Sequence, residues 1–222
     1  MSTPVLTIDG PSGVGKGTVA RVIAQQQGWN LLDSGAIYRA FALAVDSRGV
    51  EVSDESALVE IAENLDLEFK TQVDSELVSV YLDGEDVSKV LRTEQTGEMA
   101  SKIASIGVVR NALLKRQQDF AMAPGLVADG RDMGTVVFAD AAFKVYLTAS
   151  SEERANRRLK QLQAQGHAGI ISQILAEVEA RDERDSSRKH SPLKPAKDAL
   201  VIDTTELSLD EVIAQVSELV KA

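Results

Sequence analysis

The stretch Gly10-Pro11-Ser12-Gly13-Val14-Gly15-Lys16-Gly17-Thr18 follows a short apolar run at residues 5–8 and precedes a segment of helical character. A glycine-rich loop in this strand–loop–helix setting is typical of phosphate binding. The glycines let backbone N–H groups turn inward around phosphate oxygens, and the N-terminus of the following helix adds partial positive charge. Lys16 supplies the full charge that reaches the β- and γ-phosphates. The stretch therefore predicts a P-loop for a nucleoside triphosphate such as ATP.

Position 17 departs from the commonest form of this loop. Most P-loops have Ser or Thr directly after the lysine, whereas this chain has Gly17 there and places a hydroxyl one residue later, in Thr18. We therefore expect Mg²⁺ to be held through Thr18, through waters, or through a carboxylate on a neighbouring strand. Asp129 ends the apolar run 126–128, as a Walker B carboxylate does, although an aspartate there could instead cap the following turn.

Five short apolar runs alternate with longer amphipathic stretches, the pattern of strand–helix units on a parallel sheet. The runs are residues 5–8, 31–32, 126–128, 143–147 and 200–202, and four of them end at Asp9, Asp33, Asp129 and Asp203. Ligands of open α/β sheets bind beyond the carboxyl ends of the strands. We therefore expect the chemistry at these aspartates and in the loops that follow them.

One region breaks the alternation. Residues 67–69 and 78–82 read as antiparallel strands, and Asp83-Gly84 reads as a turn. Residues 51–86 contain twelve acidic side chains and one basic one, whereas residues 150–197 contain ten Lys or Arg. A solvated surface is the simplest interpretation of the acidic insert, while the basic stretch is also a candidate for binding anions.

The composition excludes several classes of protein. The 222 residues include 34 acidic and 24 basic side chains, for a formal net charge of −10, which argues against nucleic acid or an acidic membrane as a partner. Cysteine is absent, so disulfides, thiolate catalysis and Cys-based metal sites are excluded. Only His167 and His190 occur, which gives little support to Ser-His-Asp chemistry or to a multi-His metal site. No run of 18 apolar residues occurs, and the first residues lack a basic region followed by an apolar stretch, so neither a membrane span nor a signal peptide is expected. We expect a single cytoplasmic domain.

Transfer to an anionic acceptor would require several arginines, because the acceptor and the triphosphate repel each other. The chain has Arg39 after the second run, Arg110 on an expected helix, Arg131 after the third run, and Arg181 and Arg188 near the end of another helix. A protein that only binds ATP needs no such set.

The Gly-Lys-Gly-Thr form resembles that of the nucleoside monophosphate kinases, and the guanine-reading Asn-Lys-x-Asp motif of GTPases is absent. Residues 10–18, 32–39, 128–137 and 181–185 together look like bacterial cytidylate kinases, and residues 199–205 are similar to the last strand of that family. The specific signatures are Asp33-Ser34-Gly35-Ala36-Ile37-Tyr38-Arg39 and Asp129-Gly130-Arg131-Asp132-Met133-Gly134-Thr135. The likeness covers essentially the whole chain and is least motif-like at residues 66–95.

This resemblance implies an α/β P-loop fold of three layers, with a five-stranded parallel sheet, a small inserted antiparallel β subdomain and a short lid. Residues 1–50, 108–150 and 198–222 would form the core. Residues 51–107, with the insert at about 66–95, would bind the monophosphate, and residues 151–190 would form the lid. Lys16, Arg131, Arg157 and Arg158 would act in catalysis.

The resemblance also suggests an acceptor site for CMP or dCMP, made of Ser34, Arg39, Ser101, Arg110, Arg131, Asp132, Arg181, Asp185 and Arg188. Asp132 can accept from the cytosine amino group, and Arg110 or Arg188 can donate toward N3 or O2. Arg39 and Arg131 suit the monophosphate, and Arg181 and Asp185 project from one helix face toward a ribose.

Several of these assignments have plainer alternatives. Arg181 and Asp185 could form a surface ion pair, and Arg110 could face solvent. Ser34 could cap the next helix, and the arginines at 157 and 158 could lie on a solvated helix face.

The expected activity is transfer of the ATP γ-phosphate to CMP or dCMP. The second pKa of a phosphomonoester is near ~6, so the attacking phosphate is largely dianionic at neutral pH and needs no general base. The alternatives are a kinase for another small acceptor, such as UMP, AMP or a non-nucleotide, and a regulator that binds nucleotide without transfer. A monomer is expected.

Overall fold

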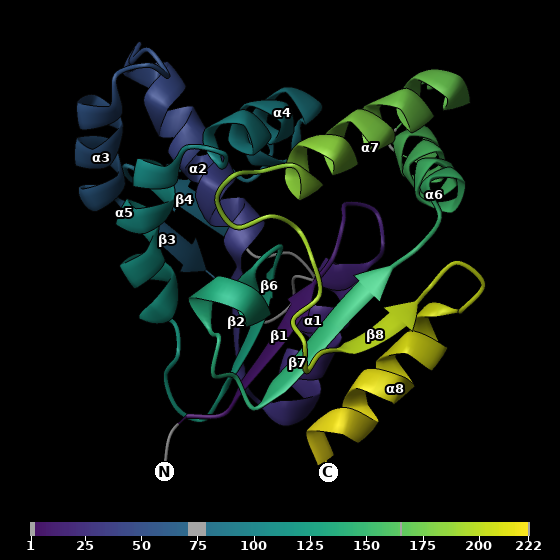
Figure 1. Cartoon of the computed structure of the whole chain (residues 1–222). Helices are drawn as coiled ribbons and strands as arrows, with labels where there is room; N and C mark the ends of the chain where they lie inside the picture. The colour runs from purple at the N-terminus through teal and green to yellow at the C-terminus, as the bar shows by residue number, and fades with distance from the viewer. Residues whose placement is uncertain (1–2, 71–78, 165, 222) are drawn as a thin grey trace. The chain divides into compact units, whose positions relative to one another are not determined.

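The computed structural model describes residues 3–70, 79–164 and 166–221 (Figure 1). The chain divides into two compact units. The first, here the core unit, combines Met1–Asp33 with Gln117–Ala222, and the second, here the inserted unit, is Ser34–Arg116. The long excursion between Asp33 and Gln117 thus folds on itself, and each unit is considered separately below.

The core unit is built on a parallel sheet with strand order β2-β6-β1-β7-β8. The strands are β1 (Val5–Asp9), β2 (Asn30–Asp33), β6 (Leu126–Gly130), β7 (Phe143–Thr148) and β8 (Leu200–Asp203). All five apolar runs are therefore confirmed as strands. The register pairs Asp9 with Gly130 and Asp33 with Asp129, so the ends of three strands and their loops lie at one edge of the sheet.

Helices flank this sheet. They are α1 (Lys16–Gln27), α6 (Ser151–Ala164), α7 (Ile171–Ser186) and α8 (Leu209–Lys221), with a π-helical turn at Met133–Val137. Helix α1 packs beside α8, and fully buried Leu6, Ile23 and Val216 belong to the cluster that they share with β1. Ser208 and Glu211 cap α8 reciprocally, as the spacing of these two residues predicts.

The inserted unit combines helices with a small sheet of order β3-β4-β5. Its elements are α2 (Ser34–Ser47), α3 (Glu55–Glu63), β3 (Leu67–Lys70), β4 (Ser79–Leu82), β5 (Glu85–Asp86), a 3₁₀ turn (Val90–Arg92), α4 (Glu94–Ile103) and α5 (Gly107–Gln118). The antiparallel pairing is confirmed, and the first residue expected in its second strand, at 78, lies outside the described residues. Positive φ angles at Asp83 and Gly84 confirm the turn, which leads into the unexpected two-residue strand β5.

The five-stranded parallel sheet with flanking helices and the separate small antiparallel sheet agree with the expected fold class. None of the helices in the described ranges is both long and apolar enough to span a membrane.

Candidate active site

The phosphate loop joins the end of β1 to the start of α1, and its backbone requires glycine. A Cβ on Gly10 would lie 2.1 Å from the carbonyl oxygen of Leu147, and Gly13 and Gly15 have φ angles of 81° and 92°. Helix α1 begins at Lys16, so its first N–H groups face the loop. The Lys16 side chain is buried, and its Nζ donates to the carbonyl oxygen of Pro11 at 2.7 Å. The lysine charge is thereby held over its own loop.

Two carboxylates stand near this lysine. Burial lowers the pKa of Lys16, as does the positive charge of Arg131, whereas Asp129 and Asp9 oppose the shift. Desolvation raises the pKa of Asp129, with Lys16 acting in the opposite direction. The buried Asp9 likewise has its pKa raised to about 6, chiefly by desolvation. At this loop the charge state of each group thus depends on its neighbours, and a bound polyanion would change the pKa of all three.

The geometry at Gly17 bears on the magnesium question. A Cβ at this position would lie 3.4 Å from Oδ2 of Asp129, so glycine leaves space directly beside that carboxylate. Thr18 follows on the exposed side of α1. Within the described ranges, no three acidic, His or Cys side chains are grouped to hold a metal ion. The residues therefore fit an ion that takes one carboxylate from the protein and completes its shell with phosphate and water.

Asp185 forms the centre of an arginine cluster in the core unit. Arg131 Nε donates to Oδ2 of Asp185 at 3.0 Å, and Arg188 donates to Oδ1 of the same carboxylate. Only 1% of Asp185 is exposed. Burial acts to raise the pKa of Asp185, but the charges of Arg131 and Arg188 outweigh it and hold this pKa below its usual value. A surface pair with Arg181 does not describe this buried carboxylate.

The π-helical turn places Asp132 next to this cluster in sequence. Asp132 is buried and directly precedes the turn at Met133–Val137. Arg131 and Asp132 thus leave the carboxyl end of β6 one after the other. Arg181 lies one turn before Asp185 on α7 and interacts with it electrostatically.

The basic helix α6 holds its three arginines differently. Arg157 is tied to Oε1 of Glu153 and to both oxygens of Thr204, the residue that follows β8. Arg158 donates to Gln161 at 2.7 Å. Arg157 is thus already engaged at the end of the sheet, and both side chains are partly buried rather than fully solvated.

Arg154 is the arginine of α6 that the sequence interpretation missed as a site residue. Its guanidinium donates to the carbonyl oxygens of Ala149 and Ser12, to Ser151 and to both carboxylate oxygens of Asp182. The side chain is 3% exposed. It therefore connects the phosphate loop to α7, a role that the sequence signals only through the small Gly13, whose Cβ would lie 3.2 Å from that of Arg154.

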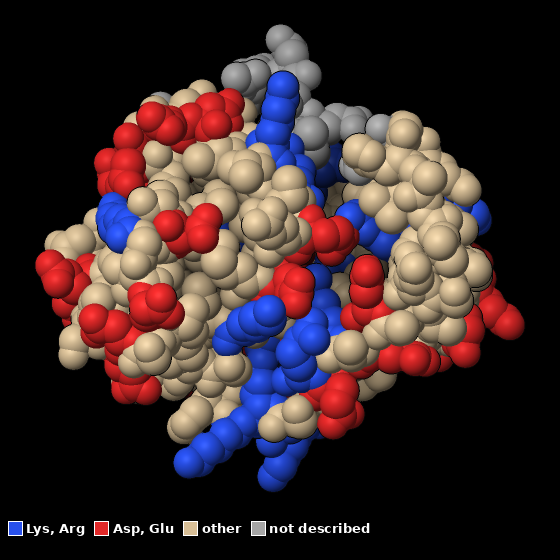
Figure 2. Space-filling view, turned by 90° about the horizontal axis from the view of Figure 1, so that it is seen from above, with Lys and Arg blue, Asp and Glu red and all other residues tan. Residues whose placement is uncertain are grey.

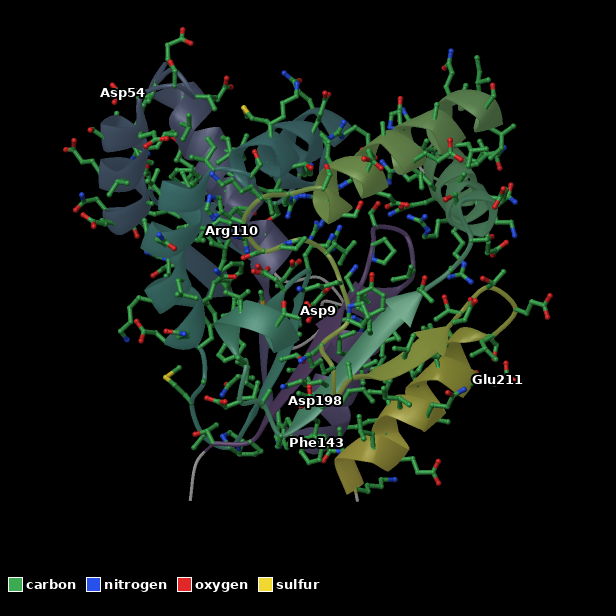
Figure 3. All side chains as sticks on the ribbon, viewed as in Figure 1. Asp9, Asp54, Arg110, Phe143, Asp198 and Glu211 are labelled. Carbon is green, nitrogen blue, oxygen red and sulfur yellow. The ribbon has the colours of Figure 1, made fainter. Side chains whose placement is uncertain are left out.

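The inserted unit carries the other four expected acceptor residues. Ser34 is the buried first residue of α2, and Ser101 is buried on α4. Arg39 donates to the carbonyl oxygen of Leu91 at 3.2 Å. Arg110, on α5, is labelled in Figure 3.

The surroundings of Arg110 exclude a solvent-facing position. Only 8% of the residue is exposed, and it donates to the carbonyl oxygen of Ala104 at 3.1 Å. Its guanidinium carbon lies 5.5 Å from the centroid of the Tyr38 ring. The tyrosine of the Asp-Ser-Gly-Ala-Ile-Tyr-Arg signature thus contacts Arg110, an expected acceptor residue far along the chain.

Figure 2 shows acidic side chains spread over much of one face, with basic side chains gathered more closely. The formal net charge of −10 therefore coexists with local concentrations of positive charge. In the core unit one such concentration is the set of arginines at 131, 181 and 188, whose charges all act on Asp185.

Comparison with known proteins gives a consistent result. The family model for cytidylate kinase matches residues 6–222. A cytidylate kinase of Aliivibrio salmonicida (strain LFI1238) is 57% identical over 96% of this chain and 94% of that protein, and one of Aeromonas salmonicida (strain A449) is 57% identical over 96% and 92%. Among solved structures, a gluconokinase from Sinorhizobium meliloti 1021 aligns with a TM-score of 0.46 and 15% identity over 98% of this chain and 92% of that chain, a likeness too low to inform function. From its sequence relatives, the chain belongs to the cytidylate kinase family.

Proposed function

We propose that this chain transfers the γ-phosphate of ATP to CMP or dCMP, giving ADP and CDP or dCDP. Membership of the cytidylate kinase family supports this reaction. The observation that carries it furthest is the pairing of a phosphate loop with a buried arginine cluster in one unit. Arg131, at the end of β6, and Lys16, at the start of α1, interact electrostatically, so the two anion-binding groups serve adjacent phosphates.

The loop 10–18 holds the triphosphate of ATP, with Lys16 at its β- and γ-phosphates. Asp129 and Thr18 hold Mg²⁺, directly or through water. When bound, this ion neutralises developing charge on the phosphates. Arg131 acts in catalysis by stabilising the transferring group, and Arg157 and Arg158 close over it. Arg157 has to exchange its bonds to Thr204 to do so.

The acceptor residues divide by the part of CMP that they bind. Arg39 and Arg131 bind the phosphate, with Ser34 beside them. Asp132, Arg110, Arg188 and Ser101 recognise cytosine, and Arg181 and Asp185 contact the sugar. Five of these residues are buried and the other four are partly buried, so their side chains are held by the fold rather than fully solvated, which supports a binding role.

A phosphate oxygen of CMP is the nucleophile. It is already largely dianionic, since its second pKa is near ~6, and no general base is required. Catalysis then consists of in-line positioning and neutralisation of charge by Lys16 and the arginines.

We assign residues 51–107, with the insert at about 66–95, to monophosphate binding and residues 151–190 to the lid. The remaining stretches, 1–50, 108–150 and 198–222, form the catalytic core. The inserted unit, Ser34–Arg116, contains the whole of the monophosphate-binding stretch. The protein acts as a cytoplasmic monomer, without nucleic acid or a membrane as a partner, which agrees with its net negative charge.

A coupled assay of ADP release with CMP, dCMP, UMP, AMP and no acceptor tests the proposal. ADP should form rapidly with CMP and dCMP only, and Lys16→Ala should reduce the rate by far more than about tenfold, or ~1.4 kcal/mol of barrier. A better rate with UMP or AMP would assign another acceptor. If none of these acceptors increases ADP release, the alternative of a regulator that binds nucleotide without phosphate transfer would be favoured.

Asp132→Asn tests how cytosine is recognised. A carboxylate accepts from the C4 amino group of CMP and faces the O4 of UMP as acceptor against acceptor, so it discriminates against UMP. Replacing the carboxylate by an amide should weaken the interaction with CMP by on the order of 1.5–3 kcal/mol and should change the interaction with UMP little. We expect the CMP to UMP ratio of kcat/KM to fall about 10-fold or more. A ratio unchanged within about twofold would mean that Asp132 only supports Arg131 or the metal ion.

A further inference from the structure

Asp9, the last residue of β1, forms a clasp with the loop that follows β6 (Figure 3). Its Oδ1 accepts from the backbone N–H of Met133 and its Oδ2 from that of Gly134, both at 2.8 Å. The two partners lie 124 and 125 residues further along the chain. Asp9 itself is 3% exposed, and no step of the reaction described above uses it.

The clasp provides hydrogen-bond acceptors for the start of the π-helical turn Met133–Val137. The first N–H groups of any helical turn lack partners within that turn. The carboxylate satisfies two of them at once, by charge-assisted hydrogen bonds that are stronger than neutral ones. Desolvation raises the pKa of Asp9 to about 6 even though both bonds act to lower it. Burial of this carboxylate is therefore costly, and its two hydrogen bonds to the turn offset part of that cost.

The clasp joins the phosphate loop to the segment that carries Arg131 and Asp132. Met133 and Gly134 come directly after Arg131 and Asp132, which we assign to the acceptor phosphate and to cytosine. Asp9 comes directly before Gly10, the first residue of the phosphate loop. The Asp9 carboxylate thus fixes the start of the phosphate loop against the backbone that carries Arg131 and Asp132. Asp9 adjoins the first residue of that loop, and its two bonding partners directly follow Asp132 in the chain.

Two glycines let the loop approach closely enough. A Cβ on Gly134 would lie 2.7 Å from Oγ1 of the buried Thr7 and 3.4 Å from Oδ2 of Asp9. A Cβ on Gly130 would lie 2.7 Å from Cγ of Met133. Gly134 thus lets the loop pack its backbone against β1, whereas Gly130 leaves room for the Met133 side chain.

We infer that Asp9 is a positioning residue for phosphoryl transfer: by holding the backbone of Met133 and Gly134, it sets Arg131 and Asp132 at a fixed place relative to the phosphate loop. The inference rests on the proposed function, since it concerns the alignment of ATP with CMP. A misplacement of about 1 Å can cost on the order of 10²-fold in rate. Breaking the clasp should therefore affect turnover much more than ATP binding.

Asp9→Asn is the first test, because the amide keeps the shape but presents an NH₂ group to one of the two N–H donors. We expect kcat/KM for CMP to fall by about 10²-fold, with a lower CMP to UMP ratio and an ATP affinity that titration calorimetry finds close to that of the wild type. Glu211→Gln is the matched control. Glu211 also accepts from a backbone N–H, that of Ser208, but it is exposed and bonds only locally, so its variant should behave as the wild type.

Gly134→Ala disrupts the same clasp from the loop side and should reproduce the kinetic pattern of Asp9→Asn. Thr7→Ala removes the hydroxyl that the new methyl group would meet. It should be nearly silent alone and should restore much of the activity in the Thr7→Ala/Gly134→Ala double variant. This pair decides the question even if Asp9→Asn does not fold.

The outcomes separate the two proposals. A wild-type chain that forms no ADP with CMP overturns the proposed function and this inference together. An active wild type whose Asp9→Asn and Gly134→Ala variants keep kcat/KM for CMP within about twofold per folded molecule overturns the inference alone. Equal losses of ATP affinity and of turnover, or a double variant that recovers stability without turnover, would also overturn it in favour of a structural cap.

Discussion

The surroundings of Lys16 disfavour the charge on its own side chain. Its ammonium group is buried, donates to the Pro11 carbonyl oxygen and faces the charge of Arg131. Burial and Arg131 lower its pKa, and the carboxylates of Asp129 and Asp9 only partly compensate. Triphosphate oxygens would bring the missing negative charge to this site.

Binding of ATP without Mg²⁺ at pH 8 should consequently take up protons. The phosphates favour the ammonium form of Lys16 and so raise the pKa that its protein neighbours lower, and up to about one proton is bound per ATP. Calorimetry in buffers of different ionisation enthalpy measures this uptake. Lys16→Arg is the control, because a guanidinium with a pKa above ~12 is always charged. Equal uptake by the two proteins would show that Lys16 is already protonated before ATP binds.

Asp185 leads to a second prediction at this scale. Its two arginine partners are buried or partly buried, so Asp185→Asn removes the carboxylate that both Arg131 and Arg188 contact and should lower the free energy of unfolding by about 3 kcal/mol at pH 7. A carboxyl group with a lowered folded pKa stabilises the fold above its unfolded pKa, and this contribution disappears as the pH falls through the folded value. The difference from the wild type should therefore shrink in thermal unfolding below about pH 4. A difference independent of pH would contradict the charge-based account.

The same substitution should weaken both acceptors, because Asp185 orients Arg131, which we assign to the acceptor phosphate. It should weaken CMP more than dCMP, because we assign Asp185 to the sugar as well. Arg181→Met removes a proposed ribose contact without disturbing that pair, so it should separate CMP from dCMP more clearly. Steady-state kinetics with the two acceptors make the comparison.

At the scale of elements, the packing of α6 against α7 depends on the ion pair of Arg154 with Asp182. Arg154 also bonds the Ser12 carbonyl oxygen, so the pair connects both helices to the phosphate loop. Exposed pairs contribute little, whereas a buried and fully hydrogen-bonded guanidinium contributes more. The contact also anchors α7 three residues before Asp185.

A double-mutant cycle with Arg154→Met and Asp182→Asn measures this contribution. We expect a coupling of about 1.5–3 kcal/mol in urea unfolding, the range for hydrogen bonds to charged groups. The cycle at Lys102 and Glu98 is the control, because this i,i+4 pair on α4 has side chains that are 63% and 58% exposed and should couple by only about 0.3–0.5 kcal/mol. Similar couplings for the two pairs would refute a special role for Arg154.

At the scale of the whole molecule, the expected acceptor residues are distributed over both compact units. Ser34, Arg39, Ser101 and Arg110 belong to the inserted unit, and the other five belong to the core unit, which also carries the phosphate loop. Substitutions in the inserted unit should therefore change the binding of CMP and leave the binding of ATP alone.

Tyr38 provides a graded test of this separation. Its ring lies under the guanidinium of Arg110, a contact that contributes about 0.5–2 kcal/mol, or a factor of ~2–30 in affinity. Tyr38→Leu should raise the Kd for CMP within this range, while the Kd for ATP stays constant. Tyr38→Phe keeps the ring and should bind both nucleotides as the wild type does. A loss of CMP binding in Tyr38→Phe would point to the hydroxyl group instead.

Local patterns in the sequence were enough to predict the five strands, the phosphate loop, the Asp83-Gly84 turn and the cap of α8. Each depends on residues within a few positions of one another, where glycine geometry and apolar periodicity act directly. The strand β5 escaped because two exposed residues, Glu85 and Asp86, carry no periodicity.

The partners of the buried charges were decided only by the tertiary structure. Asp9 finds its donors at Met133 and Gly134, Asp185 binds Arg131, and Arg154 rather than Arg158 connects the phosphate loop to α7. No local rule relates residues separated by 54 to 142 positions. Their pairing follows from strand order and helix packing, because a buried charge is stable only where the folded chain brings an opposite charge or a hydrogen-bond donor within reach.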